Sequence, residues 1–456
     1  MRTFDVVVLV AGPAGEVAAG RMAEGGLSVA IVEDRLVGGE CSFWACMPSK
    51  ALLRPYEALE EARRIPGAAE AITGSLDVQA VLDRRDEIIH DLDDGSQLPW
   101  LEDRGIALLR GFGELTGERR VRVGDEEIEA ARAVIVSTGS IPSMPPIEGL
   151  EAITDAWTNR EATTAKAIPD RLVIMGGGVV GVEMAQAFQT LGSQVTLIEG
   201  ERRLLPREEE YACEQVTEAL EGYGVEIRTG QKATRVSEAG GTVKVETSEG
   251  FTAEGDALLV ALGRKPQTKG LGLEALGIDT DAPVQVDELM RSSAASWLYA
   301  IGDVNGKALF THMGKYQGRI AADHILGKDT AVPHGADGPL SPRVIFTEPQ
   351  VAAVGHTTDT AADAGLAVDV VETSTSGNAG GSFYGRNAPG TARLLIDRER
   401  RVVVGATITG AEVADMLHAA TIAIVGEIPL ERLRHAVPCF PTRSEIWLTL
   451  LADAGV

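Results

Sequence analysis

A strand–turn–helix–strand unit that ends in an acidic residue occurs twice in this chain, and this repeat constrains the fold more than any other feature. The turn of the first copy starts at Val10, leads into an alanine-rich helix and a second apolar run, and ends at Glu33. The turn of the second copy starts at Gly176 and ends in the same way at Glu199. Turn and acid are 23 positions apart in both copies.

The equal spacing matters because such a unit is the βαβ fold of a dinucleotide site. Its glycines let the turn close, backbone N–H groups at the helix N-terminus approach a pyrophosphate, and the terminal acid accepts ribose hydroxyls. One glycine motif is a weak pattern, but two copies of identical length favour two dinucleotide sites over two unrelated glycine-rich turns. The expected binding residues are Gly12, Gly15 and Glu33 in the first copy and Gly176, Gly178, Gly181 and Glu199 in the second.

The first copy departs from the pattern at Val10, which stands where the first glycine belongs. A β-branched residue is penalised there if the turn requires a positive φ. We therefore expect the turn to open slightly and the cofactor to bind more weakly, without being lost.

Composition sets the class of protein. At 456 residues the chain is longer than one core usually serves, so about two to four domains are expected. A formal charge of -25 argues against binding nucleic acid or anionic membranes. The apolar runs fall short of the ~18 residues of a membrane span. We expect a cytoplasmic protein, in which a disulfide formed by any of the four cysteines is more often catalytic than structural.

Cys41 and Cys46 lie ahead of a helical run. In an ideal helix, residues five apart are about 8 to 9 Å apart between Cα atoms, and a disulfide tolerates no more than about 7 Å. If the two cysteines pair, the segment must be distorted, and Gly38, Gly39 and Pro48 supply the means. The alternative is a pair of small buried apolar residues, and the spacing alone does not decide between them.

Other elements follow from apolar periodicity. They are helices at 51–65 and 77–104, strands at 125–137, 255–262 and 297–303, and, after a linker at 335–339, strands at 343–354, 367–373, 391–397 and 402–408 with helices at 411–425 and 443–452.

Four motifs, in this order along the chain, carry a resemblance to a known family. They are Gly38-Gly39-Glu40-Cys41 with Cys46-Met47-Pro48-Ser49-Lys50, then Thr138-Gly139-Ser140, Gly302-Asp303, and Pro441-Thr442-Arg443-Ser444-Glu445. The chain resembles, almost end to end, the pyridine nucleotide-disulfide oxidoreductases, which include dihydrolipoamide dehydrogenase, glutathione reductase and mercuric reductase. The resemblance implies an α/β fold with two Rossmann-like domains and a C-terminal α+β dimerisation domain. Its implied boundaries are 1–150 with 271–335 for FAD, 151–270 for NAD(P), and 336–456 for dimerisation.

The resemblance also implies a role for each motif. Cys46 would be the charge-transfer thiolate beside the flavin, Cys41 the interchange thiol that meets substrate, and Lys50 with Glu183 an ion pair near the hydride-accepting nitrogen. FAD would contact Gly12, Gly15, Glu33, Lys50, Thr138, Gly139 and Asp303; NAD would contact Gly176, Gly178, Gly181, Glu199 and Gly263. No metal is expected.

The choice of nicotinamide cofactor depends on the end of the second unit. Glu199 favours NADH because an acid there accepts ribose hydroxyls and repels a 2′-phosphate. Arg202 and Arg203 follow closely and leave NADPH as the alternative.

The sequence departs from the family at its C-terminal signature. Phe440 stands where disulfide-reducing members carry a histidine that moves protons to and from substrate thiols, and a phenyl ring cannot do this. Glu445, without that partner, becomes a candidate proton donor itself. His435 is expected to be a surface or capping histidine, and Cys439 a buried small residue.

The redox segment differs too, because Phe43 and Trp44 replace smaller residues. They either narrow the channel, offer a stacking surface to a planar acceptor, or pack in the core.

These features predict a homodimeric enzyme that passes hydride from NADH to FAD, then through Cys46 and Cys41 to a small-molecule acceptor other than a common disulfide. One alternative is a quinone or diaphorase-type reductase in which reduced flavin reacts directly. Another is a dihydrolipoamide dehydrogenase-like subunit of a larger complex.

Overall fold

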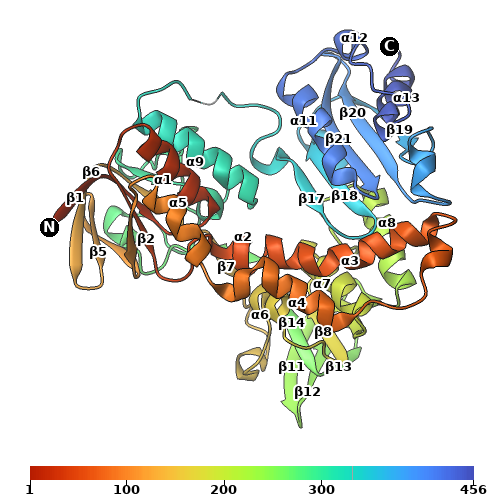
Figure 1. The fold of residues 1–456 in the computed structure, drawn as a ribbon, viewed down its shortest axis with the longest axis horizontal. Helices are drawn as coiled ribbons and strands as arrows, with labels where there is room; N and C mark the ends of the chain where they lie inside the picture. The colour runs from red at the N-terminus through yellow and green to blue at the C-terminus, as the bar shows by residue number, and fades with distance from the viewer. Residues whose placement is uncertain (331) are drawn as a thin grey trace. The chain divides into compact units, whose positions relative to one another are not determined.

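The computed structural model describes residues 1–330 and 332–456 (Figure 1). The chain divides into two compact units. Unit 1 comprises Met1–Pro48, Asp86–Ser143 and Arg264–Pro333, and unit 2 comprises Ser49–Arg85, Met144–Gly263 and His334–Val456. The domain boundaries given above remain a prediction.

Unit 1 is built on a seven-stranded sheet with the order β3-β2-β1-β6-β5-β4, to which β16 adds beside β6. Its strands are β1 (Arg2–Leu9), β2 (Val29–Glu33), β3 (Ala107–Arg110), β4 (Gly113–Gly117), β5 (Arg120–Val123), β6 (Glu126–Val136) and β16 (Leu298–Ala300). The strands β1, β2, β3, β6 and β16 pair in parallel, whereas β4 and β5 form an antiparallel extension. A separate antiparallel pair joins β7 (Ser140–Pro142) to β15 (Arg264–Pro266).

Several α-helices lie wholly within the described part of unit 1. They are α1 (Pro13–Glu24), α2 (Gly39–Phe43), α5 (Leu98–Glu102) and α9 (Thr311–Ile325). The helices α1 and α9 pack against each other. The short η6 turn (Gly302–Asn305) follows β16 and packs against α9.

Unit 2 contains a second parallel sheet with the order β10-β9-β8-β14. Its strands are β8 (Arg171–Met175), β9 (Gln194–Ile198), β10 (Glu226–Arg228) and β14 (Ala257–Val260), and a three-stranded antiparallel sheet is formed by β11 (Ala233–Ala239), β12 (Thr242–Thr247) and β13 (Thr252–Gly255). The helices of this part are α4 (Val78–Ile88), α6 (Asn159–Thr164), α7 (Val179–Thr190) and α8 (Glu210–Gly222). Helix α3 (Cys46–Arg64) begins at the end of unit 1 and continues into unit 2.

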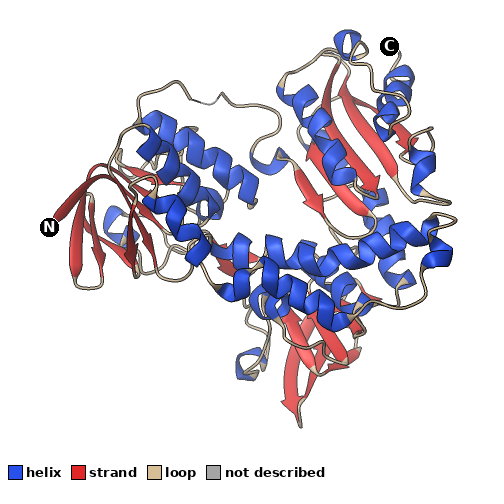
Figure 2. Cartoon of the chain, in the orientation of Figure 1, coloured by secondary structure: helices blue, strands red, loops and turns tan. Residues whose placement is uncertain are grey.

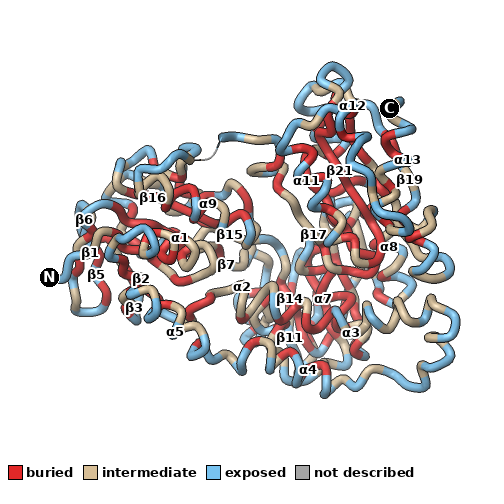
Figure 3. Tube along the Cα trace, turned by 45° about the horizontal axis from the view of Figure 1, so that its top comes forward, coloured by how far each residue is buried: buried red, intermediate tan, exposed pale blue. Residues whose placement is uncertain are grey.

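The two parallel sheets have equivalent topology, which confirms the repeat. In each copy the first strand is central, the next two strands extend to one side, and a later strand pairs on the other side. The order reverses beside the first strand, and ligands of such sheets bind outside the carboxyl ends of the strands at this point. Both sheets are buried along their central strands (Figure 3), as the continuous apolar runs predict.

The C-terminal part of unit 2 is a five-stranded antiparallel sheet with the order β17-β18-β21-β20-β19 (Figure 2). Its strands are β17 (Arg343–Ile345), β18 (Gln350–Gly355), β19 (Val368–Ser374), β20 (Thr391–Asp397) and β21 (Val402–Gly410). Its helices are α10 (Thr358–Asp363), α11 (Leu417–Val425), α12 (Leu430–Leu433) and α13 (Ile446–Asp453). Helix α11 covers β18 and β21, while α13 packs on β19 and β20. The α+β expectation is confirmed.

Three local predictions are wrong. The helix expected over 77–104 is interrupted between α4 and α5, where three consecutive residues from His90 to Leu92 have positive φ. The strand expected over 343–354 is two antiparallel strands, β17 and β18. The linker expected at 335–339 contributes Ala336, 1% exposed, to the C-terminal core.

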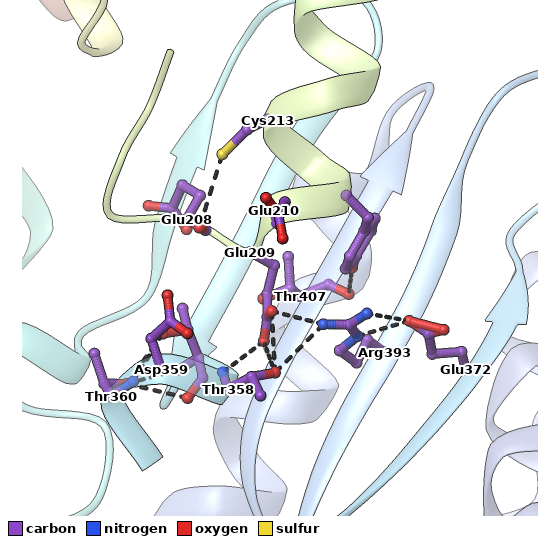
Figure 4. Close-up of polar contacts among 12 residues, drawn as sticks. Glu208, Glu209, Glu210, Cys213, Thr358, Asp359, Thr360, Glu372, Arg393 and Thr407 are labelled. Atoms are coloured by element: carbon purple, nitrogen blue, oxygen red, sulfur yellow. Dashed lines mark hydrogen bonds and ion pairs between the residues drawn. The ribbon is translucent and has the colours of Figure 1, made fainter. Parts of the chain in front are cut away.

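A polar cluster holds α8 against the C-terminal sheet within unit 2 (Figure 4). Glu209, which precedes α8, pairs with Arg393 of β20 at 2.6 Å and accepts the backbone N–H of Thr358 at 2.8 Å. Arg393 also pairs with Glu372 of β19 and lies 4.6 Å from the ring centroid of Tyr211. The Glu209 side chain is only 5% exposed, so its charge depends on these partners.

Among residues 1–330 and 332–456, no helix combines the length and apolar character that crossing a membrane requires.

Replacing Arg393 by methionine should lower the free energy of unfolding by about 3 to 5 kcal/mol, because the buried carboxylate of Glu209 loses its cation. The control is Arg398→Met, whose pair with Asp369 involves side chains 60% and 57% exposed. Its loss should cost less than about 1 kcal/mol. Urea denaturation of both variants tests this difference, and equal losses would contradict the buried role of Arg393.

Candidate functional site

The first glycine-rich turn stays closed although Val10 replaces its first glycine. Val10 has φ +80° and Gly176, its counterpart, has φ +109°. A Cβ built on Gly15 would lie 2.2 Å from the carbonyl oxygen of Val10, and one on Gly181 would lie 1.8 Å from that of Gly176. The helix therefore packs directly on the turn in both copies. The expectation that Val10 opens the turn is wrong, because the closed turn imposes a left-handed backbone on the valine instead.

The terminal acids hold the turns of their own copies. Glu33 accepts the backbone N–H of Ala11 at 2.8 Å, and Glu199 accepts that of Gly177 at 2.5 Å. The second carboxylate oxygen of each acid accepts an N–H two residues further along the chain. Burial raises the pKa of Glu33, and its two backbone hydrogen bonds oppose this shift. Each carboxylate oxygen keeps a further lone pair for a ribose hydroxyl.

The residues of both turns fit a pyrophosphate. A Cβ built on Gly12 or Gly178 would meet no described atom within 4 Å, so the backbone there is open to a ligand. Gly12 and Gly178 are the N-cap residues of α1 and α7, and no side chain caps either helix. Backbone N–H groups therefore remain for an anion. The first turn of α1 carries Glu16, whereas that of α7 carries no acid.

The two cysteines of the redox segment belong to different helices. Cys41 lies in α2, which ends at Phe43, and Cys46 opens α3. Trp44, between them, has φ -134° and is not helical. The distortion that a Cys41–Cys46 pair requires is therefore present, with Pro48 placed in the first turn of α3, where a helix tolerates proline.

The sulfur atoms of the two cysteines lie within hydrogen-bonding reach of each other. Both are free thiols in the structure. The pKa of Cys41 is raised, first by its hydrogen bond to Cys46 and then by burial, while Thr311 and Lys315 oppose the shift. Thr311, the first residue of α9, lies 3.4 Å from the sulfur of Cys46 through its hydroxyl oxygen. The raised pKa of Cys41 favours its protonated thiol.

The redox segment docks on the first turn without a side chain between them. The backbone N–H of Gly38 donates to the carbonyl of Ala11 at 2.8 Å. A Cβ on Gly39, which has φ +61°, would lie 2.8 Å from the Cα of Gly12. Only glycine fits this contact.

A second group of polar residues lies after β6 and β16 in unit 1. Asp303 accepts the hydroxyl of Ser140 at 2.6 Å, and the hydroxyl of Thr138 donates to the carbonyl of Gln267 at 2.5 Å. Burial raises the pKa of Asp303, while Ser140 and Arg264 lower it. Gly139 has φ +72°. The structure thus brings the Thr138–Ser140 motif and Asp303 together.

Lys50, one turn after Cys46 along α3, is paired within unit 2. Its Nζ lies 2.8 Å from Glu183 of α7 and 4.6 Å from the ring centroid of Phe346. The other carboxylate oxygen of Glu183 accepts the backbone N–H of Phe346 at 3.0 Å. The Glu183 side chain is only 4% exposed, so the ion pair with Lys50 is partly shielded from solvent.

Of the two arginines after Glu199, Arg203 lies near acidic residues. Arg203 lies 3.7 Å from Glu210 and 3.6 Å from Asp359, and it donates to the carbonyl of Glu208. Arg202 and Arg203 line a depression of about 460 Å³ beside the cluster of Figure 4, where acidic residues outnumber basic ones. Gly263, at the other end of the expected NAD site, has φ +98° and an open Cβ position.

The two residues just before the C-terminal signature are exposed. Phe440 is 77% exposed, and Cys439 is exposed as well, so the expectation that Cys439 is buried is wrong. His435 lies on the surface, as expected. One carboxylate oxygen of Glu445 is buried and has no hydrogen-bond partner in the part of the chain that the structure describes.

Models of two protein families match the chain. The one described as pyridine nucleotide-disulphide oxidoreductase matches residues 4–322, and the one described as its dimerisation domain matches residues 341–451. The chain belongs to the pyridine nucleotide-disulphide oxidoreductases. This oxidoreductase is a flavin-dependent enzyme of a family that uses FAD and NAD(P)H. Its dimerisation domain supports assembly as a homodimer.

Curated relatives and solved structures agree with this family. Dihydrolipoyl dehydrogenase of Thermus scotoductus is 34% identical over 453 residues, which cover 98% of this chain and 96% of the relative. The Bacillus subtilis protein of the same name is 32% identical over 467 residues, 99% of each chain. The Cu(II) complex of the HOCl-induced flavoprotein disulfide reductase RclA from Escherichia coli has TM-score 0.86 at 26% identity, covering 99% and 100% of the chains. LpdA from Mycobacterium tuberculosis has TM-score 0.87 at 25% identity, covering all of both.

Sequence reasoning missed several residues of this oxidoreductase that touch the expected site residues. Thr311, Phe346 and Arg264 each come from a distant part of the chain, and no local pattern marks them. Phe43 is 1% exposed and packs in the core, whereas Trp44 is half-buried beside it, with ring centroids 5.8 Å apart. Within the described residues, no group of three or more His, Cys, Asp or Glu could hold a metal ion.

Val10→Gly should be more stable than Val10→Ala by about 1 to 2 kcal/mol. Both changes remove most of the side chain, but only glycine relieves the left-handed backbone. At Val17, inside α1, the same two substitutions should show the opposite order by about 1 kcal/mol. Denaturation of the four cofactor-free variants tests this, and a more stable Val10→Ala would show that the turn is unstrained.

Glu16 should make stability depend on pH. Burial raises its pKa to about 7, which nearby Glu33 favours and Lys315 opposes. Because the unfolded chain releases this proton near pH 4.5, the folded state loses stability as pH rises from about 4.5 to 7 and then levels off.

Glu16→Gln should therefore leave the cofactor-free protein unchanged near pH 4.5 and stabilise it by up to about 3 kcal/mol at pH 8. Glu24→Gln, on the exposed end of the same helix, should show no such trend. Unfolding free energies measured at both pH values test this; a pH-independent gain would mean that Glu16 is charged throughout.

Proposed function

We propose that the enzyme takes hydride from NADH, reduces a Cys41–Cys46 disulfide, and passes the electrons to a small-molecule acceptor other than a common cellular disulfide. The observation that carries this proposal is the pair of reachable sulfur atoms together with an exposed Phe440 at the position of the family's proton-shuttling histidine. The site has the means to store electrons on sulfur. It lacks the base that would serve a dithiol substrate.

When bound, FAD supplies two-electron transfer between nicotinamide and sulfur. The chain's residues would hold it through the backbone N–H groups behind Gly12, the carboxylate of Glu33 for ribose, and Asp303 for the polyol. Lys50, paired with Glu183 and lying 4.6 Å from the ring centroid of Phe346, would favour negative charge on the reduced ring.

Reduction of the Cys41–Cys46 disulfide would take up two electrons and one proton. Two electrons enter the Cys41–Cys46 bond, the bond breaks, and one proton is taken up. Cys41 keeps that proton, because its pKa is raised, and Cys46 remains a thiolate beside the hydroxyl of Thr311. Cys41 is the sulfur that would meet the acceptor, which takes up the two electrons as the disulfide re-forms and Cys41 gives up its proton.

NADH is the favoured reductant. Glu199 is fixed by the N–H of Gly177 and presents negative charge where a 2′-phosphate would lie. Arg203 is already paired with Glu210 and Asp359, so it is not free to neutralise that phosphate.

Phe440 argues against an acceptor that must leave as two protonated thiols. General acid–base catalysis commonly contributes about 10² to 10⁴ in rate, and a phenyl ring contributes none. The unpartnered oxygen of Glu445 supports the same conclusion, because this glutamate is the group with which the family's histidine would pair. The curated relatives named dihydrolipoyl dehydrogenase make lipoamide the reference substrate against which this is tested.

Steady-state rates with NADH should separate the acceptor classes. We expect the wild-type enzyme to reduce lipoamide at least about 10²-fold more slowly than it reduces quinones or metal ions. Cys41→Ser should abolish the faster reaction if sulfur carries the electrons. A fast reaction that survives in Cys41→Ser would instead favour direct transfer from reduced flavin, as in a diaphorase.

Phe440→His should raise the lipoamide rate by about 10²-fold or more, since it restores a proton donor at this position. Phe440→Leu, which changes the ring but adds no base, is the matched control and should not. A wild-type lipoamide rate already equal to that of dihydrolipoyl dehydrogenases, and unchanged in Phe440→His, would overturn the weight given to this residue.

A further inference from the structure

Arg264 connects two carboxylates that the fold brings together in unit 1. It opens β15, and its Nε donates to the hydroxyl oxygen of Ser140 at 2.7 Å while its Nη2 donates to the Ser140 carbonyl at 2.7 Å. The Ser140 hydroxyl in turn donates to Asp303 at 2.6 Å. The arginine thus acts on Asp303 through one oriented hydroxyl.

The guanidinium group of Arg264 also reaches the redox segment. Its Nη2 lies 3.6 Å from Glu40, the residue before Cys41 in α2. The two side chains are 22% and 25% exposed, so solvent screens this pair only in part. Helix α2 has five residues and no side-chain cap, so it has few other means of holding its orientation.

Arg264 is the cation that favours the ionised form of Asp303. Asp303 is largely buried, which favours its neutral form, and Glu40 adds a like charge. Ser140 and Arg264 are the groups that favour its ionised form. The η6 turn that carries Asp303 also packs on α9, which carries Lys315 and Arg319; Lys315 acts on Glu16 and Cys41, and Arg319 is not among the groups that shift the pKa of Asp303.

We propose that Arg264 is a positioning residue that keeps Asp303 ionised to accept the hydroxyls of the flavin's polyol chain and, through Glu40, fixes the helix that presents Cys41. This rests on the proposed FAD site. An ionised acid accepts stronger hydrogen bonds from hydroxyls than a neutral one does, so Arg264 sets the pH range over which FAD is held tightly.

Removing the arginine should make FAD binding depend on pH. In Arg264→Met, Asp303 faces burial and Glu40 without a cation, so it takes up a proton at higher pH than in wild type. FAD affinity should then fall at least about tenfold at pH 6 and recover to within about threefold of wild type at pH 8.5, since one pKa unit corresponds to a tenfold change. Arg264→Lys retains the positive charge, so its FAD affinity should change less with pH than that of Arg264→Met.

Glu40 provides the decisive control. Glu40→Gln alone should change FAD affinity little, whereas adding it to Arg264→Met should recover most of the affinity lost at pH 6, because the like charge is gone. A role of Arg264 in packing alone would not be repaired by removing a carboxylate. Ser140→Ala, which interrupts the same chain of contacts, should also give a pH-dependent loss and serves if Arg264→Met does not fold.

The experiment is titration of the cofactor-free full chain with FAD between pH 5.5 and 8.5, followed by flavin fluorescence. Asp303→Asn is included to separate two failures. If Asp303→Asn binds FAD as tightly as wild type, the proposed FAD site is wrong. If Asp303→Asn weakens binding while Arg264→Met and Ser140→Ala show a pH-independent change, or Glu40→Gln rescues nothing, the role of Arg264 is wrong.

Discussion

The structure of the site depends on the contact between Gly12 and Gly39, where a Cβ added to Gly39 would lie only 2.8 Å from the Cα of Gly12. This contact docks the redox segment directly on the turn of the first dinucleotide unit. A hydrogen bond from Gly38 to Ala11 fixes it in register. Any side chain at residue 39 would push the cysteines away from the turn. The proposed distance between flavin and sulfur therefore depends on a glycine at this position.

The chemistry of the sulfur pair follows from a break in the chain's helical path. Because α2 ends before Trp44 and α3 begins at Cys46, the two sulfurs meet although five residues separate them. Burial and the hydrogen bond to Cys46 then raise the pKa of Cys41, which favours a proton on that sulfur. Within unit 1, Arg264 is held by Ser140, whose hydroxyl donates to Asp303, and within unit 2 Lys50 is paired with Glu183.

The sequence predicted the repeat well because its signal is local: spacing, glycines and a terminal acid all lie within one short stretch. It predicted the wrong turn at Val10 because the competing interactions come from outside the turn, from Gly15 packing on its carbonyl and Glu33 binding the next N–H. Thr311 and Arg264 were missed for a related reason. Their partners, Cys46 and Ser140, lie 265 and 124 positions away. Such pairings depend on the assembled fold and leave no periodic mark in the chain.

The central claim is that electrons from the nicotinamide come to rest on sulfur that touches the flavin. Anaerobic titration with NADH tests it most directly, with absorbance recorded at long wavelength in wild type, Cys41→Ser and Cys46→Ser. The account predicts a thiolate–flavin band that forms in wild type, persists in Cys41→Ser and is missing in Cys46→Ser. A wild type that only bleaches, or a band that survives the loss of Cys46, would contradict it.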